Sequence, residues 1–143
     1  MQLSNTRAIG FQQPGSIERN QALVDIELPT PKPEGHDILV KVEAVSVNPV
    51  DTKVRKATAP EPGEWKVIGW DAAGIVTAIG SEVTLFKTGD EVFYAGSITR
   101  SGTNAEYHLV DERIDCGHQA QNPRLGCCCC LAAHDNHGLG NAV

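Results

Sequence analysis

The sequence predicts a mainly β fold, namely a small antiparallel barrel or sandwich with one or two short helices. Short apolar runs recur roughly ten residues apart and are bounded by Gly, Pro and Asn, which is typical of all-β domains. The segment 37–47 alternates, with Ile38 and Val40 on one face and Lys41 and Glu43 on the other. This period of two indicates a half-buried strand. At 143 residues, one domain can bury a substantial core.

The first half of the chain predicts three strands and a helix. The strands are expected at residues 7–12, 22–28 and 37–47. Pro29, Pro31 and Pro33 stiffen the connection that leads to the third strand. Asn48 and Pro49 end that strand and begin a short helix over 49–56, because Asn caps helices well and Pro fits their first position.

The second half predicts three more strands. A loop at 59–63 is rich in Pro and Gly, and turns are expected at 80–81 and 88–90. The apolar runs between these signals place strands at 74–79, 91–95 and 105–110.

Composition excludes several classes of protein. The net charge of −6 and pI near 5.3 argue against a nucleic-acid surface, which needs clustered Lys and Arg. There is no apolar run of 18 residues that could span a membrane, and the first seven residues lack the apolar core of a secretory signal. We therefore expect a cytoplasmic protein.

The composition changes near residue 115. All five cysteines lie beyond it, at position 116 and at 127–130, with three of the five histidines. We expect 115–143 to be an irregular, aberrant tail, and one hypothesis is a shift of the reading frame. Cys127, Cys130, His134 and His137 allow an alternative metal site, but their spacing departs from zinc-finger patterns.

Five motifs occur in a characteristic order over residues 37–107. They are Asp37-Ile-Leu-Val-Lys-Val, Ser46-Val-Asn-Pro-Val-Asp51, Gly69-Trp-Asp-Ala-Ala-Gly74, Phe86-Lys-Thr-Gly-Asp90 and Asn104-Ala-Glu-Tyr107. This order resembles the N-terminal catalytic domain of the medium-chain dehydrogenase/reductase superfamily, in the zinc-type alcohol dehydrogenase-like branch related to NADPH:quinone reductase. The resemblance implies a GroES-like, partly open β-barrel over residues 5–114. In the family a Rossmann domain follows, which we expect to be absent here.

The resemblance also bears on zinc. In zinc-dependent members a Cys, a hydroxyl residue, an Asp and a relay His fall at the positions of Asn48, Val50, Asp51 and Lys53, and a second ligand falls at Trp70. Zinc requires thiolate, imidazole or carboxylate donors, which Asn and Trp cannot supply. The segment 97–103, where the family has a cysteine-rich structural zinc lobe, contains no cysteine. We expect no zinc.

The candidate cleft residues are carried over from the same resemblance. It implies that Asn48 faces the nicotinamide, that Trp70 and Tyr94 form apolar walls, and that two acids hold the surrounding loops. With Lys53 at the relay position, the full candidate set is Asn48, Asp51, Lys53, Trp70, Asp71 and Tyr94.

Simpler interpretations exist for most of these residues. Asn48 suits a helix cap, Trp70 suits a core, and Asp71 suits a structural hydrogen bond. Lys53 and Arg55 suit a solvated helix face. His36 and His108 belong to no motif, and we expect no role for either.

The leading hypothesis is a truncated, zinc-independent, NAD(P)H-dependent oxidoreductase. The intact family would transfer hydride to a quinone or an activated carbonyl or alkene, with NADPH as the implied cofactor. We expect a small-molecule substrate, no nucleic-acid or membrane partner, a homodimer in the intact family, and little activity from this chain alone. The alternatives are a stand-alone GroES-like binding or assembly module and a zinc-binding protein that uses the tail.

Overall fold

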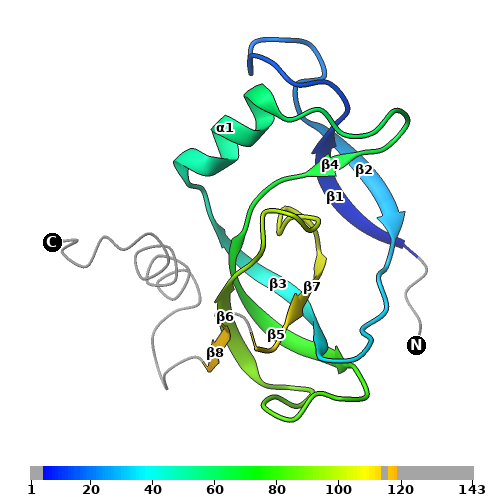
Figure 1. Ribbon diagram of the computed structural model, residues 1–143, viewed down its shortest axis with the longest axis vertical. Helices are drawn as coiled ribbons and strands as arrows, with labels where there is room; N and C mark the ends of the chain where they lie inside the picture. The colour runs from blue at the N-terminus through cyan, green and yellow to red at the C-terminus, as the bar shows by residue number, and fades with distance from the viewer. Residues whose placement is uncertain (1–4, 114–115, 119–143) are drawn as a thin grey trace, which may run out of the picture.

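The computed structural model describes residues 5–113 and 116–118. It is a mainly β structure with one helix, as the sequence predicts (Figure 1). The elements are β1 (Asn5–Phe11), β2 (Val24–Pro29), β3 (Asp37–Ser46), α1 (Pro49–Ala57), β4 (Lys66–Val67), β5 (Asp71–Ile79), β6 (Glu91–Ala95), β7 (Tyr107–Asp111) and β8 (Cys116–His118).

The strands form two antiparallel sheets, one in the order β2-β1-β4 and one in the order β7-β3-β5-β6-β8. Within the described residues, an isolated bridge connects Ala8 of β1 to Ala105, two residues before β7. The Ile9 amide donates to the Asn104 carbonyl at 2.9 Å, and the Glu106 amide donates to the Arg7 carbonyl at 2.9 Å. Neither sheet closes on itself, so the fold is the partly open barrel that the sequence predicted.

The described residues contain three apolar clusters, of which the smallest is Ala73 with Ala44 and Phe93 packed against it. The largest lies on the inner face of the five-stranded sheet and contains Ile38, Val40, Ala72, Val76, Phe86, Val92, Tyr94 and Val110. The second contains Phe11, Ile68 and Trp70, with Val50 and Val54 of α1 packed against it. This second cluster holds the helix against the start of β5.

Most predicted elements are confirmed, with differences at the ends. β5 begins at Asp71, three residues before the predicted start at residue 74. β4, only two residues long, was not predicted. The prediction of an irregular tail from residue 115 is wrong for 116–118, which form β8. This strand pairs with β6 and covers what would otherwise be a free sheet edge. The rest of the predicted tail lies outside the described residues.

Gly74 allows β5 to pass close to β3. A Cβ at this position would lie 2.1 Å from the carbonyl oxygen of Lys41 and 2.8 Å from the Val40 side chain. The pairing of β3 with β5 is irregular here, with a shift between Val42 and Ala44. Only glycine fits such an approach of two backbones.

Within the described residues, no helix is long and apolar enough to cross a membrane.

Candidate functional site

Asn48, Asp51 and Asp71 come together where β3 passes into α1. Asn48 precedes the helix and is half-buried, whereas Asp71 begins β5 and is 1% exposed. The side-chain amide of Asn48 donates from Nδ2 to Oδ2 of Asp71. The amide nitrogen can only donate and a carboxyl oxygen can accept, so this contact holds the amide with its nitrogen toward Asp71. Residues 23 positions apart are thus joined at the candidate site.

Asp51 caps the first turn of α1. Its Oδ2 accepts from the Asn48 backbone amide at 2.6 Å, and its own amide donates to the Asn48 carbonyl at 3.0 Å. The carboxylate is buried at the positive end of the helix dipole, where negative charge is stabilised. Asn48 therefore occupies the cap position. Asp51 anchors the Asn48 backbone, and the Asn48 side chain reaches Asp71.

Trp70 packs inside the second cluster and is 3% exposed. Its carbonyl accepts from the Gly96 amide at 2.6 Å. The preceding Gly69 has φ of +93°, a conformation that favours glycine. Among the described residues, the Trp70 indole nitrogen has no hydrogen-bond partner. Trp70 is thus a core residue, and it directly precedes Asp71, the partner of Asn48.

Tyr94 belongs to the largest cluster and has no exposed surface. Its hydroxyl lies 2.9 Å from Nδ1 of His108, and the two rings stack at 5.5 Å between centroids. Tyr94 and Trp70 therefore lie in different clusters, and both are buried.

His108 has a defined structural role that its sequence did not suggest. Its Nε2 lies 2.8 Å from the Ser101 carbonyl, which can only accept, so Nε2 carries the proton and Nδ1 accepts from the Tyr94 hydroxyl. Burial lowers the pKa of His108 to about 4. The one signal in the sequence was its place in an alternating strand, on the same face as Val110.

The prediction that Lys53 and Arg55 lie on a solvated helix face is correct for one of the two residues. Lys53 is exposed, which agrees with a solvated position. Arg55, however, is 6% exposed, and its Nη1 donates to the Gly15 carbonyl at 2.7 Å. The Gly15 amide returns a bond to the Arg55 carbonyl at 3.1 Å. The prediction for Arg55 was wrong because a long loop before β2 folds over the helix.

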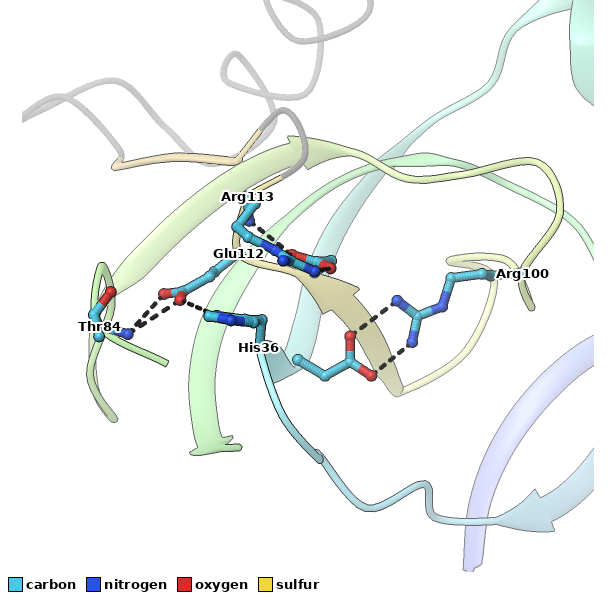
Figure 2. A network of polar contacts seen from close by, with 7 residues as sticks. His36, Thr84, Arg100, Glu112 and Arg113 are labelled. Carbon is cyan, nitrogen blue, oxygen red and sulfur yellow. Dashed lines mark hydrogen bonds and ion pairs between the residues drawn. The ribbon is translucent and has the colours of Figure 1, made fainter. Parts of the chain in front are cut away.

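A buried acid at the end of β7 joins three segments. Glu112 accepts from the Thr84 amide and from Nδ1 of His36, the latter at 3.0 Å (Figure 2). It also accepts from the Leu85 amide at 2.7 Å. Burial favours a higher pKa for Glu112, but the hydrogen bonds from His36, Leu85 and Thr84 outweigh it and hold the pKa below its usual value. His36, for which we expected no role, therefore takes part in a structural clamp.

The donors around Asn48 bear on metal binding. Asp51 and Asp71 contribute carboxylates, while the adjoining side chains are an amide and an indole. Within the described residues, no group of three or more His, Cys, Asp or Glu side chains could hold a metal ion.

The alcohol dehydrogenase GroES-like domain model matches residues 34–135, more than half of the chain. This chain belongs to that family. The matched range extends beyond residue 114 into the cysteine-rich segment.

Several curated proteins resemble the chain. A zinc-type alcohol dehydrogenase-like protein of Staphylococcus aureus (strain COL) is 50% identical over 108 residues, which cover 76% of this chain and 32% of that protein. The quinone oxidoreductase of Homo sapiens is 39% identical over 105 residues, covering 73% and 31%. The chain thus spans about a third of the length of these relatives.

Solved structures of proteins with alcohol dehydrogenase or quinone oxidoreductase names also resemble this chain. A protein from Rhizobium etli CFN 42, named for the zinc-dependent alcohol dehydrogenases, is 60% identical with a TM-score of 0.82, over 85% of this chain and 35% of that one. The Escherichia coli quinone oxidoreductase complexed with NADPH is 25% identical with a TM-score of 0.71, over 86% of this chain and 36% of that one.

Proposed function

We propose that the described barrel is the substrate-side portion of a zinc-independent, NAD(P)H-dependent oxidoreductase. In the complete enzyme, hydride would pass from the nicotinamide to a quinone or an activated carbonyl or alkene, because this is what the family resemblance implies. The cofactor supplies the difficult chemistry, and the protein supplies orientation and a water-poor cleft. The quinone oxidoreductases among the relatives and the NADPH complex of the Escherichia coli protein support this proposal.

The Asn48–Asp71 hydrogen bond carries the zinc-independent part of the proposal. The resemblance places zinc ligands at Asn48 and Trp70, and here an amide and a buried indole occupy those positions. The amide is already bound to Asp71. Zinc would have to break that bond and would find too few donors of the kind it prefers. Some relatives are named as zinc-type proteins, but those names say nothing about the side chains at Asn48 and Trp70 of this chain.

In this proposal Asn48 is the group that faces the nicotinamide or substrate. It is half-buried at the start of α1, so the residue is partly accessible. Asp71 acts as a positioning residue, because it holds the amide in one orientation. The cofactor itself would be held by a nucleotide-binding domain of the kind the resemblance implies, and the isolated chain would show no saturable hydride transfer.

Metal analysis tests the zinc-independent part. A variant with all five cysteines changed to Ser removes binding by the tail, and it is compared with the same variant carrying Asp71→Asn. After purification with added zinc, both should retain far less than one equivalent by mass spectrometry. One equivalent of zinc in the first protein that is lost in the second would refute the proposal.

A hybrid enzyme tests the oxidoreductase part. Residues 5–113 would replace the matched segment of the Staphylococcus aureus relative, and NADPH oxidation with 1,4-benzoquinone would be followed. We expect activity that resists 1,10-phenanthroline and falls when Asp71→Ala removes the acceptor that holds the Asn48 amide. A folded hybrid without activity, or one stopped by the chelator, would contradict the proposal. Saturable NADPH-dependent activity of the 143-residue chain would contradict its need for a second domain.

A further inference from the structure

The barrel has a seam where β1 meets the segment that leads into β7. The two are joined by the Ala8–Ala105 bridge and by the bond from the Glu106 amide to the Arg7 carbonyl. Next to this ladder is a cleft of about 380 Å³ lined by both strands. Its size falls within the range of small-molecule sites, toward the lower end.

The cleft wall is mainly apolar. Its apolar lining residues come from β2 and the loop after it, and from β7 and the position two residues before that strand. They are Leu28, Pro29, Pro31, Ala105, Tyr107 and Leu109. Ligand sites usually combine such walls with a few polar groups.

Thr6 is a polar group with an unmet hydrogen bond at this cleft. It lines the cleft and is 3% exposed. Along β1, Thr6 and Ala8 are buried while Asn5 and Arg7 are exposed, so the Thr6 side chain points inward. Among the described residues its hydroxyl has no hydrogen-bond partner. A buried hydroxyl without a partner is costly, and a ligand group could satisfy it.

The charges at the cleft are balanced. The Arg100 guanidinium is held by Asp37 through two parallel bonds, Nη1 to Oδ1 at 3.0 Å and Nη2 to Oδ2 at 2.8 Å (Figure 2). The His108 imidazole is neutral, because its pKa is lowered to about 4 by burial, and its one N–H is bound to Ser101. Among the described residues, no acidic residue lines the cleft. The site therefore favours an uncharged ligand.

We propose that this cleft binds a small, neutral, mainly apolar molecule whose single hydroxyl or carbonyl group hydrogen-bonds to Thr6 Oγ1. Because Asn48, Asp51 and Asp71 do not line the cleft, it is distinct from the proposed hydride-transfer site. The inference does not depend on that proposed function, and the two can fail separately.

Titration of the full chain with 2-naphthol, followed by amide chemical shifts in NMR, tests the proposal. The probe is neutral at pH 7 and carries one hydroxyl on an apolar ring system. We expect saturable shifts centred on Thr6, Ala105, Tyr107 and Leu109. The anion 2-naphthoate has the same rings with a carboxylate, and it should bind at least about tenfold more weakly because the cleft has no unbalanced positive charge.

The matched variants are Thr6→Val and Thr88→Val. The first removes the hydroxyl at constant shape and should raise the Kd of 2-naphthol about three- to tenfold, the effect of one net hydrogen bond. The second changes an exposed Thr in a turn and should leave the Kd unchanged. If Thr6→Val fails to fold, Leu109→Ala should raise the Kd by removing a half-buried wall contact.

Three results would overturn the proposal. They are shifts that do not saturate or lie elsewhere on the surface, equal Kd values for the two Thr variants, and binding of 2-naphthoate as tight as that of 2-naphthol.

Discussion

Replacing His108 by Gln should make the stability of the protein depend less on pH between pH 7 and pH 5. The imidazole is 5% exposed, accepts from Tyr94 and donates to Ser101. It must stay neutral to make both bonds, and burial lowers its pKa from 6.5 to about 4. Gln retains one donor and one acceptor but does not titrate in this range.

The magnitude follows from linkage between protonation and folding. The unfolded chain binds a proton at His108 below about pH 6.5, whereas the folded chain does so only near pH 4. The stability contributed by neutral His108 is therefore complete above about pH 7 and declines as the pH falls toward 4. The loss amounts to about 2 kcal/mol between pH 7 and pH 5, and about 3 kcal/mol in total.

Urea unfolding at pH 7, 6 and 5 measures this effect, with the fluorescence of Trp65 and Trp70 as the signal and a reducing agent present. His108→Gln should be less stable at pH 7 by about 1–2 kcal/mol, since it loses the ring stack on Tyr94. Its dependence on pH should be shallower than that of the wild type by about 1 kcal/mol per pH unit.

Val110→Ala is the matched control for that experiment. It truncates a buried residue of the same strand and should lower stability without changing the pH dependence. A His108→Gln protein that keeps the wild-type pH dependence would refute the assignment of a neutral, proton-sensitive imidazole at this position.

Two further changes probe the clamp at Glu112 and the close approach at Gly74. Glu112→Gln should cost about 1–3 kcal/mol at pH 7, because one carboxylate oxygen that takes amide bonds from Thr84 or Leu85 is lost. It should also reduce the loss of stability below pH 4.5, since the low pKa of Glu112 contributes stability that is present above the unfolded pKa and lost as the pH falls through the folded one. An unchanged urea midpoint would show that the clamp contributes nothing. Gly74→Ala should destabilise by more than about 2 kcal/mol, because its Cβ meets the Lys41 carbonyl at 2.1 Å, and a midpoint equal to the wild type would disprove that close approach.

The strands were predictable wherever local pattern and tertiary burial agree. Alternation over 37–47 identified β3, whose inner residues Ile38 and Val40 are fully buried. The pattern was weaker at the start of β5, where Asp71 and Ala72 look unlike a strand but pair with Ala95 and Tyr94. Tertiary pairing extended the strand beyond what the sequence indicated.

The side-chain roles were less predictable, because their partners lie far away in sequence. Arg55 is paired with the Gly15 carbonyl, 40 positions away, and Glu112 bonds to amides 27 and 28 positions away. A charged residue in a short helix or a charged run normally lies at the surface. Burial of these two depends on loops whose paths no periodicity encodes.

Asn48 shows how a structural and a functional interpretation can hold for one residue. A helix cap alone would let the Asn48 side chain bond to the helix's own amides, as caps usually do. Here Asp51 binds the Asn48 backbone from inside the helix, and the Asn48 amide bonds to Asp71 at the start of β5. The cap thereby fixes the position of the backbone, and Asp71 fixes the direction of the amide. In the function proposed above, an amide fixed in this way would orient a ligand with little further loss of conformational entropy.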